Sequence, residues 1–475
     1  MALLYKACHC ESRQVYEELY SPSEMNSKSY FKSFAIENFV RYNIINFGGQ
    51  TLLAAFTFFT SVLIARWLGP LNNGVYNLII FIVTLSVQFA NLGIVASNVY
   101  FTGNRRFSLS DIIGNSLTLS VGLALLTIFT FLGLLLTKGF RTFLQNNSLS
   151  VYQFGLAALT VPISTCLLFF NSIILGQGRI IAYNLINIVR ILLQLFWLTV
   201  LVAILQHGLR GAIFSYFLAV VSTLLLSARL VRQTARFRFT LNLPLLRASI
   251  NYGIKAYIGN LMQFFSYRLN IFFVAYFLGA EAVGQYAVAL TVAESLWLVA
   301  GSVGQILFPY VSAMGEEKAN RLTPKATRHT LFLVFLIATS LVVLARPVIK
   351  LIFGGVYLPA LPALLWLLPG VVLLSIPKIL SQDLAGRGHP ELGALSAFFA
   401  FIVSLPLSWF LIPLWGLAGA AISSTAGYAA AAAVVIIAFC RLSGVSWLET
   451  LVIRPSDFHL YVRLLLQFLR IRSRG

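Results

Sequence analysis

The sequence predicts an all-α polytopic membrane protein, with twelve transmembrane helices in two parallel-repeat six-helix bundles around a central cavity. Three observations support this fold class: the composition, the recurrence of long apolar stretches, and an internal repeat. Of the 475 residues, 59% are hydrophobic and only 10% are charged, and the mean hydropathy is +0.86. A soluble domain typically contains about 25% charged residues. The composition therefore predicts a chain that lies in lipid.

Apolar stretches long enough to cross a bilayer occur along the whole chain. A transmembrane helix needs about 20 consecutive, mostly apolar residues, and twelve such stretches can be identified. They lie at about 44–65, 76–99, 112–136, 151–175, 181–205, 210–231, 254–277, 284–308, 329–352, 360–380, 391–413 and 416–440. The tenth stretch contains several prolines, which predict a bend there.

The same membrane unit occurs twice, at a constant offset. In each copy a Leu-Gly turn separates the first two apolar stretches, and a second glycine and a tyrosine follow the turn. The offset is 279 − 69 = 210, and the matched positions are Gly69 and Gly279, Gly74 and Gly284, Tyr76 and Tyr286, Gly176 and Gly386, and Gly178 and Gly388. Six stretches per copy is an even number, so both copies enter the bilayer in the same orientation. Duplicated bundles of this kind usually place a substrate path between their halves, which points to transport.

The net charge of +20 follows the predicted membrane topology. With the N-terminus taken as inside, 26 of the 34 Lys and Arg residues lie in inner segments, which are 1–43, 100–111, Arg179, 229–255, 309–328, 377–390 and 441–475. Such a bias is the positive-inside pattern of membrane proteins, and it places both termini in the cytoplasm. Anionic lipid head groups explain the basic excess, so nucleic acid is not an expected partner.

Loop charges and apolar stretches divide the chain into five segments. They are a cytoplasmic N-terminal segment (1–43), a first six-helix bundle (44–231), a cytoplasmic linker (232–250), a second six-helix bundle (251–440) and a basic cytoplasmic tail (441–475). Within the tail, Tyr461–Arg470 is apolar and basic but too short to span, which is typical of a helix that lies on the membrane surface.

No sequence pattern for catalysis or for a bound cofactor is present. The chain lacks a glycine-rich phosphate loop with its lysine, and it lacks a Ser-His-Asp arrangement. Cys8-His9-Cys10 falls short of a complete structural zinc pattern, so no metal site is predicted. We therefore expect no enzyme, no catalytic residue and no cofactor. Energy would come from an ion gradient or the membrane potential, and the choice of H⁺ or Na⁺ as coupling ion stays open.

Charged side chains inside the apolar stretches are the best indicators of function. A charge at the centre of a bilayer costs at least about 2.5 kcal/mol, so it normally has a partner or lines water. Arg268 and Glu294 lie 13 residues before and 13 residues after Glu281 in the hairpin turn (281 − 268 = 13, 294 − 281 = 13), which places them at a similar depth. Two interpretations stay open. The residues neutralise each other across the hairpin, or one or both face a central cavity.

A third buried charge, Arg190, lies in the fifth stretch. Asn184, Asn187 and Gln194 follow helical spacing around it, so these four side chains fall near one helix face. Such a polar stripe indicates either helix packing or contact with water.

The acidic residues are equally informative, because they are so few. Between Glu37 and Glu281 the only acid is Asp111, at the edge of a stretch, and Glu294 is the only acid deep in the second bundle. A cavity with arginines and amides favours an anionic, hydroxyl-rich substrate, since guanidinium groups bind phosphate oxygens in pairs. The predicted substrate-binding residues are Arg268, Arg190, Asn187 and Gln194, with Glu294 as charge partner or coupling group.

Several short motifs together resemble a known family. In order they are Gly48-Gly49, Leu68-Gly69-Pro70, Gly176-Gln177-Gly178-Arg179, Ala293-Glu294 and Leu307-Phe308-Pro309. Over residues 40–440 the chain resembles the polysaccharide-transporter branch of the multidrug/oligosaccharidyl-lipid/polysaccharide exporter superfamily, which includes O-antigen and exopolysaccharide flippases. The resemblance implies that two bundles around a central cavity move undecaprenyl-diphosphate-linked glycans from the inner to the outer leaflet. It also implies membrane lipids, a glycan polymerase and glycosyltransferases as partners, and the bacterial inner (plasma) membrane as the location.

Two alternatives stay open. A cation-coupled multidrug or toxin extruder of the same fold is expected to place acids in the first bundle. A non-transporting scaffold for glycan-assembly enzymes would explain the two terminal segments but not the buried charges.

Overall fold

The computed structural model describes residues 28–235, 237–313, 315–454 and 457, with side chains from Gly48 onward except that of Lys255. The first 27 residues, with Cys8-His9-Cys10, and the predicted surface helix at Tyr461–Arg470 lie outside this part of the chain.

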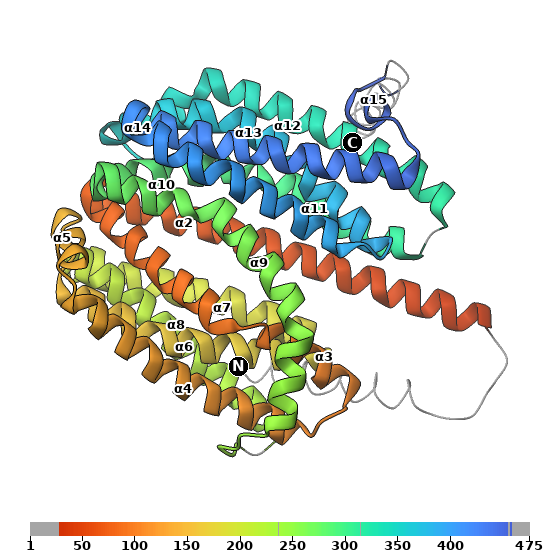
Figure 1. Cartoon of the computed structure of the whole chain (residues 1–475), viewed down its shortest axis with the longest axis horizontal. Helices are drawn as coiled ribbons and strands as arrows, with labels where there is room; N and C mark the ends of the chain where they lie inside the picture. The colour runs from red at the N-terminus through yellow and green to blue at the C-terminus, as the bar shows by residue number, and fades with distance from the viewer. Residues whose placement is uncertain (1–27, 236, 314, 455–456, 458–475) are drawn as a thin grey trace, which may run out of the picture.

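The described chain is almost entirely helical and forms two bundles, which Figure 1 shows one above the other. The first half contains α2 (Lys28–Asn91), α3 (Ile94–Asn104), α4 (Leu109–Leu136), α5 (Lys138–Asn146), α6 (Val151–Gly176), α7 (Ile180–Leu198), a π-helical turn η1 (Thr199–Ile204) and α8 (Gly208–Arg232). The second half contains α9 (Leu243–Leu278), α10 (Ala280–Ser295), α11 (Trp297–Ala313), α12 (Glu316–Ile352), a 3₁₀ turn η2 (Gly355–Ala360), α13 (Leu361–Gly386), α14 (Pro390–Ser443) and α15 (Trp447–Leu451).

The helices are compatible with the predicted twelve spans. Nine of the described helices are long and apolar enough to cross a membrane, and the bent pair α10 and α11 makes a tenth span. Two of these helices, α2 and α14, are each broken by a non-helical residue, Gly69 and Gly416 respectively. Counting the two broken helices as two spans each gives twelve.

The turns of the two halves share one backbone conformation, as expected for an internal repeat. Gly69 and Gly279 have φ values of 71° and 84°, and the matched pair Gly178 and Gly388 has values of 74° and 93°. These are left-handed values that favour glycine. The structure therefore supports the duplication found in the sequence.

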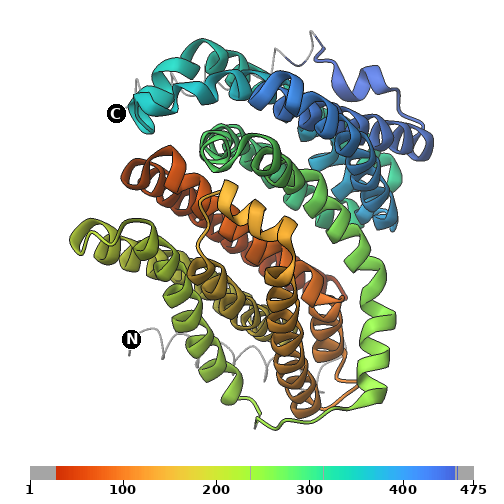
Figure 2. The same cartoon turned by 60° about the vertical axis from the view of Figure 1, so that its left-hand side comes forward.

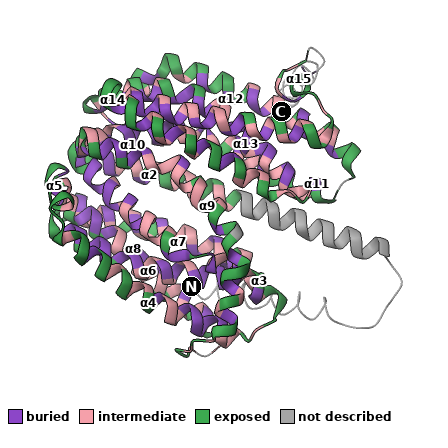
Figure 3. Cartoon of the chain, viewed as in Figure 1, coloured by how far each residue is buried: buried purple, intermediate pink, exposed green. Residues whose placement is uncertain are grey.

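Exposed residues lie on the outer faces of both bundles (Figure 3), and many of them are large and apolar. On α4, Leu126 and Phe129 are 62% and 69% exposed, and on α12 Val343 is 77% exposed. Soluble monomers rarely expose apolar surface on this scale. The protein is a multi-pass membrane protein, and these faces contact lipid.

The backbones of α2 and α10, one from each half, are in close contact at one end of the molecule, which we call the hairpin end because it contains Gly69 and Gly279. There, a Cβ atom added to Gly74 would lie 1.6 Å from the Ala280 carbonyl oxygen, and one added to Gly284 would lie 2.0 Å from the Pro70 oxygen. The two contacts are related by the repeat. They bring α2 and α10 side by side between the two bundles, which Figure 2 shows from a second direction.

Further contacts close the hairpin end. Arg66 of α2 donates hydrogen bonds to the carbonyl oxygens of Leu351 and Ile352, the last residues of α12. The Tyr357 hydroxyl, fully buried, donates to the Ala65 carbonyl oxygen at 2.8 Å. All three bonds join the first half to the second half.

At the opposite end, which we call the linker end because it contains residues 233–242, the bundles diverge and α9 connects them (Figure 1). The first part of α9 packs on the first bundle: Tyr252 stacks on Tyr100 with ring centroids 4.2 Å apart, and Gly253 lies against Gly93. The last part of α9 packs on α14 and α10. The predicted domain limits at 231 and 251 stay predictions.

The predicted topology gives a direct test. Asn72 at the hairpin end and Lys318 at the linker end are both exposed. In a chain whose four native cysteines are replaced by serine, an impermeant thiol reagent added outside cells should label Asn72→Cys and leave Lys318→Cys unlabelled until the membrane is permeabilised. Equal labelling of both positions in intact cells would contradict the positive-inside assignment.

The segment after α14 is fixed to α12 by a buried ion pair. Arg328 donates through Nε and Nη2 to the two carboxylate oxygens of Asp457 at 2.5 and 2.8 Å, and the two side chains are 11% and 5% exposed. The hydrogen bonds from Arg328 lower the pKa of Asp457 to about 2. A carboxylate with a depressed pKa stabilises the folded state above its unfolded pKa of roughly 4, and this contribution is lost as the pH falls through about 2.

Asp457→Asn should therefore release this segment already at neutral pH. We expect faster amide hydrogen exchange in residues 446–452 of the variant, whereas the wild-type protein should keep its protection from pH 7 down to roughly pH 4. Glu449→Gln is the control, because Glu449 and Arg454 form an exposed pair that contributes little. Hydrogen exchange measured by mass spectrometry decides the matter, and equal rates in wild type and Asp457→Asn would show that the ion pair does not hold the segment.

Candidate functional site

Arg268 and Glu294 form a bidentate ion pair inside the second bundle. Nη1 and Nη2 of Arg268 donate to the two carboxylate oxygens of Glu294 at 2.9 and 3.0 Å. The pair joins α9 to α10, which follow each other across the Gly279 turn, so the hairpin brings both residues to the same depth. The Glu294 side chain is 20% exposed and that of Arg268 is 39% exposed. The pair is therefore neutralised but still accessible.

Three aromatic rings and a lysine lie beside this pair. Tyr267 directly precedes Arg268 and Trp297 lies three residues after Glu294, and their ring centroids are 5.1 Å apart. Tyr428 of α14 contacts both rings at 6.0 and 6.1 Å. The Lys378 ammonium of α13 lies over Tyr267 and Trp297, 4.9 and 5.1 Å from their centroids, as in cation–π contacts. The Trp297 Nε1 donor is buried and has no hydrogen-bond partner among the described residues.

Lys378 is a candidate site residue that the sequence analysis missed. We grouped it with the charges of the inner membrane face, because it belongs to a basic segment at the end of the tenth stretch. The structure places it within α13, eight residues before the helix ends at Gly386 (386 − 378 = 8). The signal that could have found it is this distance: two turns of helix still separate Lys378 from the loop.

A buried hydrogen-bond network lies on the other side of Arg268. Asn270 donates to the Ser424 hydroxyl at 2.5 Å and to the Ala420 carbonyl oxygen at 3.2 Å, and Ser408 donates to Asn270. The Tyr286 and Ser424 hydroxyls are 3.1 Å apart. These side chains hold α9, α10 and α14 together and thereby fix the position of Arg268. Polar residues of this kind are common in apolar helices, and their partners could not be read from the sequence.

The polar stripe on α7 lies against α2 in the first bundle. Gln194 is 6% exposed and donates to the Tyr76 hydroxyl at 2.9 Å. Asn187 donates to the Tyr183 carbonyl oxygen of its own helix at 3.1 Å. Gln194 therefore contributes to helix packing. The half-buried Arg190 guanidinium makes no hydrogen bond or ion pair with any described residue.

Arg190 and Arg268 lie in different halves of the chain, on α7 and α9 respectively. Tyr76 and Tyr286 are matched by the repeat and are buried where the halves meet. Among the described residues no hydrogen bond joins Arg190 to Arg268, so the structure does not bring the predicted set into one cluster.

The second half contains a second buried acid besides Glu294, and the sequence analysis did not identify it. Asp383 on α13 is fully buried, and it accepts hydrogen bonds from Arg387 at 2.6 Å and from Thr323 at 2.5 Å. It lies three residues before the end of α13 and is neutralised there (386 − 383 = 3). In the part of the chain that the structure describes, no group of three or more His, Cys, Asp or Glu side chains is placed to hold a metal ion.

Comparison with known proteins identifies the family. Residues 63–362, which are more than half of the chain, match the family described as "Polysaccharide biosynthesis protein". The chain belongs to this family. The resemblance inferred from the short motifs is thereby confirmed.

Two related proteins align with part of this chain. The chain is 29% identical over 189 residues to the "Uncharacterized membrane protein MJ1068" of Methanocaldococcus jannaschii, covering 39% of this chain and 37% of the relative. It is 23% identical over 192 residues to the "Probable low-salt glycan biosynthesis flippase Agl15" of Haloferax volcanii, covering 38% and 40%. Each alignment thus spans about two fifths of the relative's length.

Solved structures confirm the fold of this polysaccharide biosynthesis protein. The "Lipid II flippase MurJ, inward closed conformation" has a TM-score of 0.68 at 14% identity, covering 84% of this chain and 87% of MurJ. An inward-facing multidrug resistance MATE family transporter has a TM-score of 0.63 at 15% identity, covering 85% of this chain and 98% of the transporter. At these identities the likeness shows the fold alone.

Proposed function

We propose that this protein is a flippase that moves a polyprenyl-diphosphate-linked oligosaccharide from the inner to the outer leaflet by alternating access. One observation carries the proposal: in a two-bundle membrane fold of the polysaccharide biosynthesis family, basic side chains outnumber acidic ones at the positions within the helices where a charge costs the most free energy. Arg190, Arg268 and Lys378 lie within helices of the two bundles, and Glu294 is the acid that pairs with one of them. The excess positive charge suits an anionic head group.

The chemistry of the site fits the two parts of such a head group. The oxygens of a diphosphate accept paired hydrogen bonds from a guanidinium. Their negative charge also attracts the positive charge of an ammonium. Arg268 is 39% exposed and Lys378 rests on two rings, so both present donors beside an aromatic surface. Tyr267, Trp297 and Tyr428 provide flat faces and polar edges for sugar rings. Glu294 holds Arg268 in position and is the candidate for a proton or cation that couples transport to a gradient.

The contacts between the halves support gating by rigid-body movement. At the hairpin end, Gly74 and Gly284 bring α2 and α10 into backbone contact, and Arg66 and Tyr357 add hydrogen bonds. We propose that rocking residues 44–231 against 251–440 breaks these contacts and opens the hairpin end, which the predicted topology places outside. The head group then crosses between the halves while the lipid tail stays in the bilayer. Lipid-linked glycan, membrane lipids and glycan-assembly enzymes would be the partners.

Transport by the purified protein in liposomes tests the proposal. We expect a fluorescent polyprenyl-diphosphate disaccharide, placed in one leaflet, to become accessible in the other leaflet only when the protein is present. Efflux of a soluble cationic dye without lipid translocation would instead show the multidrug extruder. Binding of glycosyltransferases with neither activity would show the scaffold, and both of these results would overturn the proposal.

A further inference from the structure

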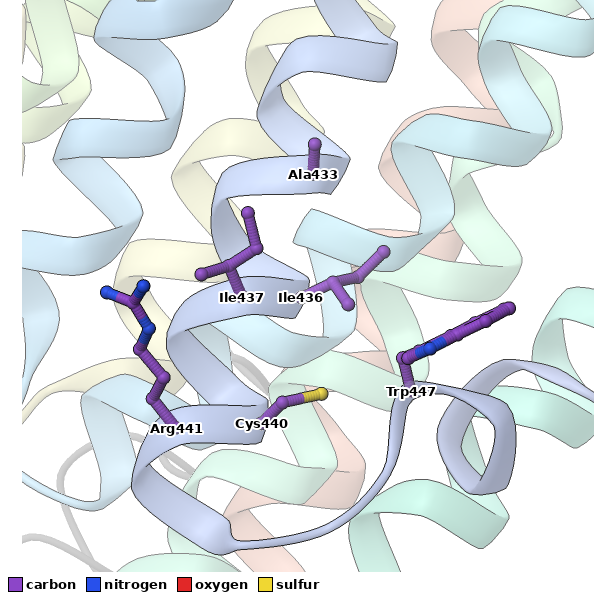
Figure 4. A pocket seen from close by; sticks show the side chains of 6 residues that line it. All are labelled: Ala433, Ile436, Ile437, Cys440, Arg441 and Trp447. Atoms are coloured by element: carbon purple, nitrogen blue, oxygen red, sulfur yellow. The ribbon is translucent and has the colours of Figure 1, made fainter.

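An apolar groove lies on the outer surface of α14 at the linker end (Figure 4). Its volume is about 440 Å³, within the range of about 300–1,000 Å³ that is typical of ligand sites. Six residues line it: Ala433, Ile436, Ile437, Cys440, Arg441 and Trp447. In Figure 4, Ile436 and Cys440 point toward Trp447, and Arg441 extends along the other side of the helix toward Ile437.

The apolar and the charged parts of the groove follow each other along the helix. Ala433, Ile437 and Arg441 are four residues apart, so they form one column on α14. From Arg441 to Ala433 the column rises about 12 Å, since each residue of a helix adds about 1.5 Å. One leaflet of hydrocarbon is about 15 Å thick, half of a typical bilayer core. The column therefore covers most of the thickness of one leaflet, and the Cα atom of Arg441 lies at the end of the column nearest the linker end of the molecule.

Trp447 and Arg441, at the edges of the groove, are residue types that are common at a membrane interface. Trp447 is 54% exposed, and it lies just beyond the end of α14 at Ser443. Tryptophan is enriched at the head-group level, and arginines near helix ends extend to the same level. Arg441 is exposed and makes no hydrogen bond or ion pair with a described residue.

The groove is preformed, because the wall that contains Trp447 is held in place by contacts at the end of α14. The Asn320 side chain of α12 donates to the Ser443 carbonyl oxygen at 2.9 Å, which fixes the end of α14. Gly444 then turns the chain with φ 69°, and Ser446 caps α15, of which Trp447 is the first residue. The ion pair between Arg328 and Asp457 holds the segment that follows.

We propose that this groove binds one anionic phospholipid of the surrounding bilayer. Its acyl chain lies along Ala433, Ile437 and Cys440, against the Trp447 indole, and its phosphate accepts hydrogen bonds from Arg441. The predicted topology places the linker end at the cytoplasmic leaflet, where anionic lipids are concentrated. The site lies on α14 beside α15, away from the contact of α2 with α10, so it is separate from the proposed path of the glycan lipid.

Native mass spectrometry of the full chain in detergent, titrated with phosphatidylglycerol, tests the charge contact. We expect Arg441→Gln to lower the affinity of the tightest bound lipid about tenfold, the effect of losing one charge-assisted hydrogen bond. Arg229→Gln is the matched control, since Arg229 is an exposed last-turn arginine of α8 at the same end of the molecule, and its affinity should not change. Equal affinity in wild type and Arg441→Gln would overturn the proposal.

Photo-crosslinking identifies the occupant. With p-benzoylphenylalanine in place of Ile437, or of Ala433 if the first variant does not fold, ultraviolet light should produce an adduct with the mass of phosphatidylglycerol. An adduct with a peptide from residues 458–475 of the same chain would overturn the proposal, and so would the absence of any adduct at both positions. Displacement of phosphatidylglycerol by an equal concentration of polyprenyl diphosphate would assign the groove to the transported lipid instead, and inorganic phosphate should not compete.

Discussion

Replacing Arg268 with alanine is expected to abolish lipid flipping in reconstituted liposomes. The substitution removes a guanidinium that is paired with Glu294 and belongs to a side chain that is 39% exposed. A hydrogen bond to a charged group contributes about 1.5–3 kcal/mol, so binding of a diphosphate should weaken about tenfold or more. Arg268→Lys keeps the charge but loses the paired geometry, and it should keep part of the activity. Flipping rate per reconstituted protein is the quantity to measure.

The double variant Arg268→Ala with Glu294→Ala separates a binding role from a structural one. Removing only the arginine leaves an unpaired carboxylate in the membrane, whereas removing both leaves no uncompensated charge. If the pair were purely structural, the double variant would recover folding and transport together. We expect it to recover thermal stability and to stay inactive. Wild-type flipping by the double variant would remove both residues from the substrate site and leave Arg190 and Lys378 as the buried candidates.

Gly74→Ala is expected to stop transport by preventing closure of the hairpin end. An added Cβ would lie 1.6 Å from the Ala280 oxygen, and the atom it meets is backbone, which has no other rotamer to adopt. Overpacking costs about 1–3 kcal/mol in well-packed cores, so the population of the closed state relative to the open state should fall about 5-fold to 150-fold. Gly284→Ala should behave in the same way, because the repeat places it against the Pro70 oxygen.

Reagent accessibility measures this shift directly. Ala287 is 9% exposed beside the contact of α2 with α10, so Ala287→Cys should react slowly with an impermeant thiol reagent and faster when Gly74→Ala is added. Gly139→Ala is the matched control at the same end, since a Cβ there meets nothing within 4 Å. Unchanged labelling in the Gly74→Ala background would show that the hairpin end does not need this contact to close.

The sequence predicted the features that depend on local chemistry and on counting along the chain. Gly69 and Gly279 were found by the constant offset of the internal repeat, and both have a positive φ in the turn between two spans. The depth of Arg268 and Glu294 followed from their equal distance to the turn, and the structure pairs them.

Contacts between distant segments could not be predicted in this way. Lys378 rests on rings from α9 and α11, more than 80 residues away from it (378 − 297 = 81), and a charge count assigned it to the membrane face. Gln194 was placed in the polar stripe of a cavity, but its amide bonds to Tyr76 of α2. Periodicity gives the face of a helix on which a side chain lies, and only packing shows whether that face meets another helix or an open path.

Crosslinking the halves at the hairpin end tests the central claim of alternating access most directly. Arg66 and Leu351 are exposed and in contact between the halves, so Arg66→Cys with Leu351→Cys in a cysteine-free chain can be joined by a thiol crosslinker of about the length of an arginine side chain. Arg141→Cys with Leu136→Cys is the matched control, because Arg141 contacts the Leu136 carbonyl oxygen at the same end but within the first half. We expect the crosslink between the halves to stop flipping, the control crosslink to leave it unchanged, and cleavage of a reducible crosslinker to restore it. Full flipping after complete crosslinking of Arg66→Cys to Leu351→Cys would contradict the account.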